Sequence, residues 1–190
     1  MATTSVRNEV AVMSDVAHGA ERAAVSVRTL GGGLAALRIF SGLVWLSNGL
    51  AKVFFNQNSN FDWGFVSFGL INQPSARSVL ERAAEQIFQP LRWIYQDLVL
   101  ANWTFFAWFL TIAEVVAGIS LLFGIASRLG ATIGLLLIGP IWIMLLHTNL
   151  YLWEYPNELV PLLILAVVPA GRFLGQDRKL AVRFHGRWPF

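Results

Sequence analysis

The sequence predicts an all-α integral membrane protein, a four-helix bundle with short amphipathic helices in its first outer loop. Of the 190 residues, 56% are hydrophobic and 13% are charged, which is more apolar and less charged than an ordinary soluble domain. The apolar residues gather in four runs, and the first run carries a single polar stripe. A soluble helix needs a broad polar face, so this inverted pattern indicates lipid outside and polar groups turned toward other helices.

The first predicted span covers residues 34–55 and opens a four-helix membrane domain that extends to residue 175. Residues 1–33 precede it as a tail assigned to the cytoplasm. At the helical spacing of 100° per residue, the polar and small residues of the span fall on one face. They are Arg38, Ser41, Gly42, Trp45, Asn48, Gly49 and Lys52. The rest of the chain is expected to supply the helices that this face contacts.

The connection from residue 56 to residue 102 predicts two short amphipathic helices on either side of Pro90. Their apolar residues recur at helical spacing and include Leu80, Ile87, Leu91 and Ile94. For a subunit of a complex, we expect these four residues to form a surface that docks on a partner. Two placements stay open, because the outer loop could cap this bundle or dock on another subunit.

The remaining spans are predicted at 103–123, 129–147 and 159–174. A helix needs about 20 residues to cross a bilayer, so the fourth span must tilt or extend into the preceding residues. A tight turn at Ser127–Arg128 joins the second and third spans, and residues 176–190 form a basic tail.

Lysine and arginine predict the orientation. Four spans place nine basic residues on the side of the termini and four on the other side. The positive-inside rule therefore places both termini in the cytoplasm and the chain in the cell inner membrane. Basic residues at the ends of spans also explain the pI of about 9.8, so no nucleic-acid partner is expected.

Glu114 is the one acidic residue between Trp103 and Tyr151, and it lies near the middle of its span. A charge at that depth costs about 2.5–3.5 kcal/mol and needs a partner, a proton or a watery cavity. Counting residues from the outer ends predicts a buried pair between Arg38 and Glu114. Two interpretations stay open: the pair could only fix the helix register, or the carboxylate could handle protons or anchor a ligand.

A polar cluster at the outer side predicts a quinone or ligand site formed by Asn48, Lys52, Glu114 and His147. A quinone head needs donors for its two carbonyls and a proton route on reduction. The chain has no cysteine, which excludes thiolate metal sites, and no metal-spacing motif predicts a metal. A second membrane histidine is lacking, which excludes bis-histidine haem, while ligation of a haem or chlorin by His147 alone stays open.

Several short motifs point to a known family. They are R-x-x-x-G from Arg38, N-G-x-x-K from Asn48, E-x-x-x-G from Glu114, the turn LLFGIASR, and a closing stretch from Glu158 through Gly171 to Asp177. In this order they resemble the DoxX/DoxD-like family of small four-helix membrane proteins, over residues 34–55 and 103–180.

The resemblance implies a structural or quinone-adjacent membrane subunit of a larger redox or energy-converting complex. The alternative that it implies is the membrane component of a quinone-reducing oxidoreductase of the thiosulfate:quinone type, with its quinone site at the outer side. Thiol chemistry would then need a partner chain, and whether this chain catalyses any reaction stays open. Membrane lipid and other membrane subunits are the expected partners. Four spans without a visible repeat give little support to a permease.

Overall fold

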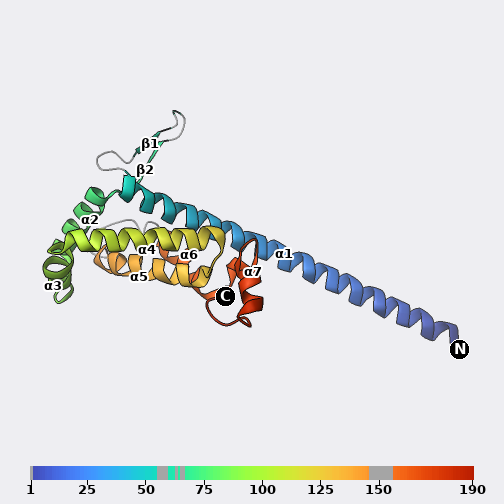
Figure 1. The fold of residues 1–190 in the computed structure, drawn as a ribbon. Helices are drawn as coiled ribbons and strands as arrows, with labels where there is room; N and C mark the ends of the chain where they lie inside the picture. The colour runs from blue at the N-terminus through green and yellow to red at the C-terminus, as the bar shows by residue number, and fades with distance from the viewer. Residues whose placement is uncertain (1, 55–59, 63, 65–66, 146–155) are drawn as a thin grey trace.

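The structure is a computed structural model that describes the chain except residues 1, 55–59, 63, 65–66 and 146–155 (Figure 1). Its helices are α1 (Ala2–Phe54), α2 (Gln73–Gln86), α3 (Leu91–Trp93), α4 (Trp103–Phe123), α5 (Ser127–Leu145), α6 (Pro156–Val167) and α7 (Asp177–Arg183). A π-helix η1 (Ile94–Leu100) and a 3-10 helix η2 (Ala170–Arg172) complete the helical elements, and β1 (Asn60–Asp62) pairs antiparallel with β2 (Ser67–Gly69). The predicted all-α class is confirmed.

Four helices pack side by side as a ring (Figure 1). Helix α1 contacts α4 and α6, and α5 contacts the same two helices from the other side. Trp45, Leu121, Leu162 and Leu165 are buried between them. The core of the chain therefore lies along the axis of this ring.

Glycines bring α1 and α4 into close contact. A Cβ atom added at Gly42 would lie 2.4 Å from the backbone nitrogen of Leu122, and one added at Gly118 would lie 2.5 Å from that of Leu46. Neither position can hold a larger side chain without separating the helices. The small residues of these two apolar runs thus serve packing.

Helix α1 is continuous from Ala2 to Phe54, so the residues expected as a separate tail belong to it. Its N-terminal part extends alone beyond the bundle (Figure 1), and residues 18–30 are all exposed. The part of α1 from His18 to Phe54 and the whole of α4 are each long and apolar enough to cross a membrane.

The last two bundle helices are shorter. Their apolar stretches are Ser127–Ile143 in α5 and Asn157–Val167 in α6. The expected extent of the fourth span, to residue 174, is wrong because α6 ends at Val167. Pro169 explains this end, since proline donates no backbone N–H and disfavours helical backbone at the residue before it.

Helices α2 and α3 with η1 cover one end of the bundle, as a cap. Asn72 begins α2 by accepting a 2.9 Å hydrogen bond from the Ser75 backbone N–H, and the chain resumes as a helix after Pro90. Helical segments are thus present on both sides of Pro90, as predicted, and the second consists of the short α3 followed by η1.

The apolar face of this cap packs on the chain itself. Leu80 and Ile87 are 4% and 2% exposed, and Leu91 packs against them together with Trp103 of α4 and Ile141 of α5. Ile94, the fourth residue of the expected docking surface, is half-buried. The prediction that Leu80 and Ile87 dock on a partner is therefore wrong, because the chain itself buries them, while docking through Leu91 and Ile94 stays a prediction. Helical spacing shows that a face is apolar but not which surface covers it.

Candidate functional site

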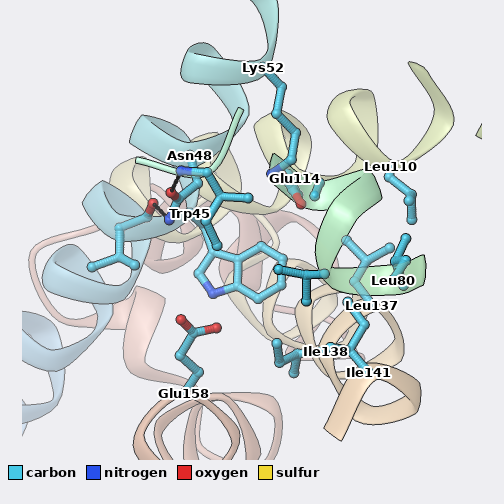
Figure 2. Close-up of a pocket in the computed structure, with 14 residues that line it drawn as sticks. Trp45, Asn48, Lys52, Leu80, Leu110, Glu114, Leu137, Ile138, Ile141 and Glu158 are labelled. Atoms are coloured by element: carbon cyan, nitrogen blue, oxygen red, sulfur yellow. Dashed lines mark hydrogen bonds and ion pairs between the residues drawn. The ribbon is translucent and has the colours of Figure 1, made fainter. Parts of the chain in front are cut away.

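A cavity of about 220 Å³ lies beneath the cap, between α1, α2, α4, α5 and α6. Its walls are largely apolar and include Val44, Trp45, Val79, Leu80, Leu110, Leu137, Ile138 and Ile141 (Figure 2). Four polar side chains also line it: Asn48, Lys52, Glu114 and Glu158. The cavity is thus the place where polar residues of α1, α4 and α6 meet, at the end of the bundle that the cap covers.

Lys52 and Glu114 form an ion pair in the cavity wall. The Lys52 Nζ and Glu114 Oε2 atoms are 2.6 Å apart, and the two side chains are 6% and 18% exposed. The helices that carry them approach closely at this level, since a Cβ atom at Gly49 would lie 3.1 Å from the Val115 backbone nitrogen. Each charge compensates the other where water is scarce.

Asn48 lines the cavity, but its side-chain amide is already hydrogen-bonded within the protein. Its Oδ1 accepts a 3.0 Å hydrogen bond from the Ile71 backbone N–H, and its Nδ2 donates 3.1 Å to the Val44 carbonyl. The side chain therefore ties the chain that enters α2 to helix α1. Asn48 positions the cap, which leaves Lys52 and the carboxylates as the polar groups available to a ligand.

Glu158 contributes a second carboxylate. It lies in the first turn of α6, is exposed, and forms no ion pair with any residue that the structure describes. Figure 2 draws its carboxylate on the other side of the Trp45 indole from the Lys52–Glu114 pair. Sequence reasoning did not assign Glu158 to the site. An acid at the start of an otherwise apolar helix was the available signal.

Arg38 lies elsewhere, at the opposite end of the bundle. Its Nη1 donates to the carbonyls of Leu121 and Leu122, the latter at 3.1 Å, and its Nη2 donates 3.1 Å to the Leu174 carbonyl. The guanidinium is fully buried. The predicted Arg38–Glu114 pair is therefore wrong, because Lys52 binds the carboxylate while Arg38 satisfies carbonyls that the C-terminal end of α4 leaves free.

Asp177 holds the same end of the bundle together. Its Oδ1 accepts 2.6 Å from the Ala126 N–H, and its Oδ2 accepts 2.9 Å from the Ser127 N–H and 2.7 Å from the Ser127 hydroxyl. A Cβ atom at Gly171 would lie only 2.0 Å from Asp177 Oδ2. Arg38, Ser127 and Asp177 are called the inner clamp below. Sequence reasoning had quoted Asp177 only as the last residue of the family pattern.

The turn inside the inner clamp follows from one glycine. Gly124 ends α4 with a left-handed backbone, φ +64°, and α5 begins at Ser127. Glycine adopts this conformation without steric cost, so the chain can reverse within a few residues. The tight turn predicted at Ser127–Arg128 is present but lies just before them, at residues 124–126, because Ser127 and Arg128 are the first two residues of α5.

Three of the four residues predicted for the ligand site line one cavity, namely Asn48, Lys52 and Glu114. His147 lies outside the described residues. Within the part of the chain that the structure describes, no three histidine or acidic side chains are grouped as metal ligands would be. Chemically, the site can donate hydrogen bonds from the Lys52 ammonium and can accept or release protons at two carboxylates.

No protein-family model, no curated protein and no solved structure matches this chain. The resemblance to the DoxX/DoxD-like group therefore rests on the sequence motifs alone. Of those motif residues, Arg38 and Asp177 belong to the inner clamp, and Gly42, Gly49 and Gly118 lie where α1 and α4 contact each other.

Proposed function

We propose that this chain is a multi-pass membrane protein of the DoxX/DoxD-like type, with both termini in the cytoplasm. Large apolar side chains on the outside of the bundle support this proposal, among them Phe40, Phe105, Leu136 and Val167, each at least 65% exposed. Exposing so much apolar surface to water is unfavourable, whereas lipid accepts it. In this orientation α1, α4, α5 and α6 cross the membrane and the cap lies outside.

We further propose that the cavity beneath the cap binds the head of a membrane quinone. The observation that carries this proposal is the buried Lys52–Glu114 pair in the wall of an otherwise apolar cavity, with Glu158 across from it. Ionisable groups at membrane depth usually mark a ligand or proton path. The apolar walls suit a planar ring, and the ammonium can donate to a quinone carbonyl.

The size of the cavity fits the head rather than the whole molecule. Sites for complete drug-sized ligands occupy about 300–1,000 Å³, and this cavity holds about 220 Å³. An isoprenoid tail would therefore leave between the helices toward lipid. The reduction of a quinone to a quinol takes up two electrons and two protons. We assign proton transfer to Glu114 and Glu158, and electron supply to a redox subunit bound to this chain.

A purely structural role in a larger complex is the second candidate. The projecting part of α1 favours it, because residues 19–30 are all exposed and include Val25, Val27 and Leu30, each more than half exposed. This stretch offers an exposed helical surface on which another subunit could bind.

Quinone binding by the purified chain separates the two candidates. A short-chain quinone analogue titrated into detergent-solubilised protein should bind, and Lys52→Met with Glu114→Gln should weaken binding by about 10–100-fold through loss of a charge-assisted hydrogen bond. Changing both residues avoids a stranded charge. Arg77→Met, which removes an exposed cation of α2, is the matched control and should bind normally.

Each outcome is informative. If the double variant and the wild-type chain bind the quinone analogue with equal affinity, the cavity is not the quinone site. Absence of binding by the wild-type chain, combined with other chains that co-purify in mild detergent, would favour the structural role.

A further inference from the structure

We propose that the C-terminal segment, residues 170–190, is a docking surface for the headgroups of anionic phospholipids. This inference rests on the proposed membrane insertion but concerns the end of the bundle opposite the quinone cavity. Three observations support it: the segment has a fixed geometry, its positive charge is not paired within the described chain, and apolar side chains lie between the charged ones.

The segment is folded against the bundle. Asp177 ties its helix α7 to the turn between α4 and α5, and the Gln176 N–H donates 3.2 Å to the Phe123 carbonyl. Further along, Arg172 Nη2 donates 2.7 Å to the Phe190 carbonyl, and the rings of Phe184 and Phe190 stack with centroids 4.9 Å apart. The side chains of this segment are therefore presented from a defined scaffold.

The charge of the segment is strongly positive. It contains five basic residues and one acidic residue, Asp177, which is buried and engaged in the inner clamp. Four of the basic residues are exposed and form no ion pair with any described residue: Arg178, Lys179, Arg183 and Arg187. These four cations are therefore free to bind an anionic surface.

Apolar side chains are exposed among these cations. Leu174 and Val182 are 82% and 81% exposed, and Trp188 is 53% exposed. At helical spacing, Val182 projects between Arg178 and Lys179 on the outer face of α7. Nucleic acid or an acidic protein loop would compensate the charge but leave these apolar groups in water.

The position of the segment also favours a membrane. Figure 1 shows α7 running across the axis of the bundle, at the end opposite the cap. The neighbouring residues of α4 and its turn, Phe123 and Ile125, are 54% and 43% exposed, so the apolar outer surface of the bundle continues toward Leu174. A helix with cations and apolar groups at this level lies in the headgroup layer, where anionic lipids bind it.

Single cysteines can test this placement, because the chain contains none of its own. The full-length chain with Val182→Cys, labelled with a polarity-sensitive fluorophore, is placed in nanodiscs of phosphatidylcholine with or without phosphatidylglycerol. We expect the emission to shift to the blue with phosphatidylglycerol. Arg178→Gln with Arg183→Gln should lower the apparent affinity for the anionic lipid by about 25-fold, since each basic residue contributes about fivefold.

Two further labelled positions make the result decisive. Val25→Cys, on the projecting part of α1, is the matched control and should not respond to lipid composition. Leu136→Cys, on the outer face of α5, should report hydrocarbon in both nanodiscs, and a watery signal there would refute the proposed membrane insertion itself. If Leu136 reports hydrocarbon while Val182 stays in water, the docking surface alone is refuted. An equal response of Val182 to inorganic phosphate in detergent would also refute it, because any anion would then suffice.

Discussion

Arg38 and Lys52 are two buried cations about four turns apart on one face of α1, and their surroundings differ completely. Arg38 donates to backbone carbonyls in the closed inner clamp. Lys52 binds a carboxylate in the wall of a cavity. A backbone carbonyl can neither move away nor take up a proton, whereas a carboxylate can do both. A polar stripe on a membrane helix therefore marks its inward face, and the partner of each group decides whether it can take part in chemistry.

The inner clamp should respond to change with the largest loss of stability. Asp177→Ala leaves three donors at Ala126 and Ser127 without their acceptor and removes a negative charge that acts on buried Arg38. We expect the free energy of unfolding to fall by about 3–5 kcal/mol, as for a broken buried charge network. Thermal or denaturant unfolding in detergent measures it.

Asp97→Ala provides the control for this change, because Asp97 is an exposed aspartate in η1. It should unfold like the wild-type chain. Equal stability of the Asp177→Ala variant would show that the clamp does not hold the turn between α4 and α5.

The cap over the cavity should show an intermediate effect. Ile87 is 2% exposed and packs on the bundle, while the adjacent Phe88 is 57% exposed. Ile87→Ser should lower the free energy of unfolding by about 1.5–3 kcal/mol through lost apolar burial, and Phe88→Ser should leave it nearly unchanged. Unfolding of the two variants in the same detergent gives the comparison. Equal losses would mean that the cap does not pack as described.

The smallest effect is the coupling between Lys52 and Glu114. In a double-mutant cycle, Lys52→Met and Glu114→Gln should be non-additive by about 1 kcal/mol, because the two groups touch. The cycle of Arg38→Met with Glu114→Gln should be additive within about 0.5 kcal/mol. Coupling in the second cycle and not in the first would restore the pairing expected from the sequence and would contradict the contrast between the two cations.

Local features could be predicted well from the sequence. Helical spacing on both sides of Pro90 indicated the two cap helices, since proline interrupts a helix by its own geometry. The turn near Ser127 followed a glycine at the end of an apolar run. Lys52, Asn48 and Glu114 were expected to share a site as a polar cluster in otherwise apolar helices, and all three line one cavity.

Long-range partners could not be predicted in the same way. Arg38 was paired with Glu114 from their estimated depths in the membrane, which considers side-chain charges alone. The free backbone carbonyls at the C-terminal end of α4 are the actual acceptors. Asn48 was predicted to bind the ligand, but its side-chain oxygen accepts a hydrogen bond from the Ile71 N–H, just before α2. The partner of the cap was likewise decided by packing with Trp103 and Ile141, which the pattern around Ile87 does not encode.

The continuity of α1 has a consequence for distance. A helix rises 1.5 Å per residue, so the stretch from Ala2 to the level of Gly31, where contact with Phe173 begins, measures about 45 Å. A continuous helix of this length fixes the distance between its two ends. Whatever binds near its N-terminal end would be held at a set height above the inner clamp, and a rotation of the helix would turn Arg38 and Lys52 together.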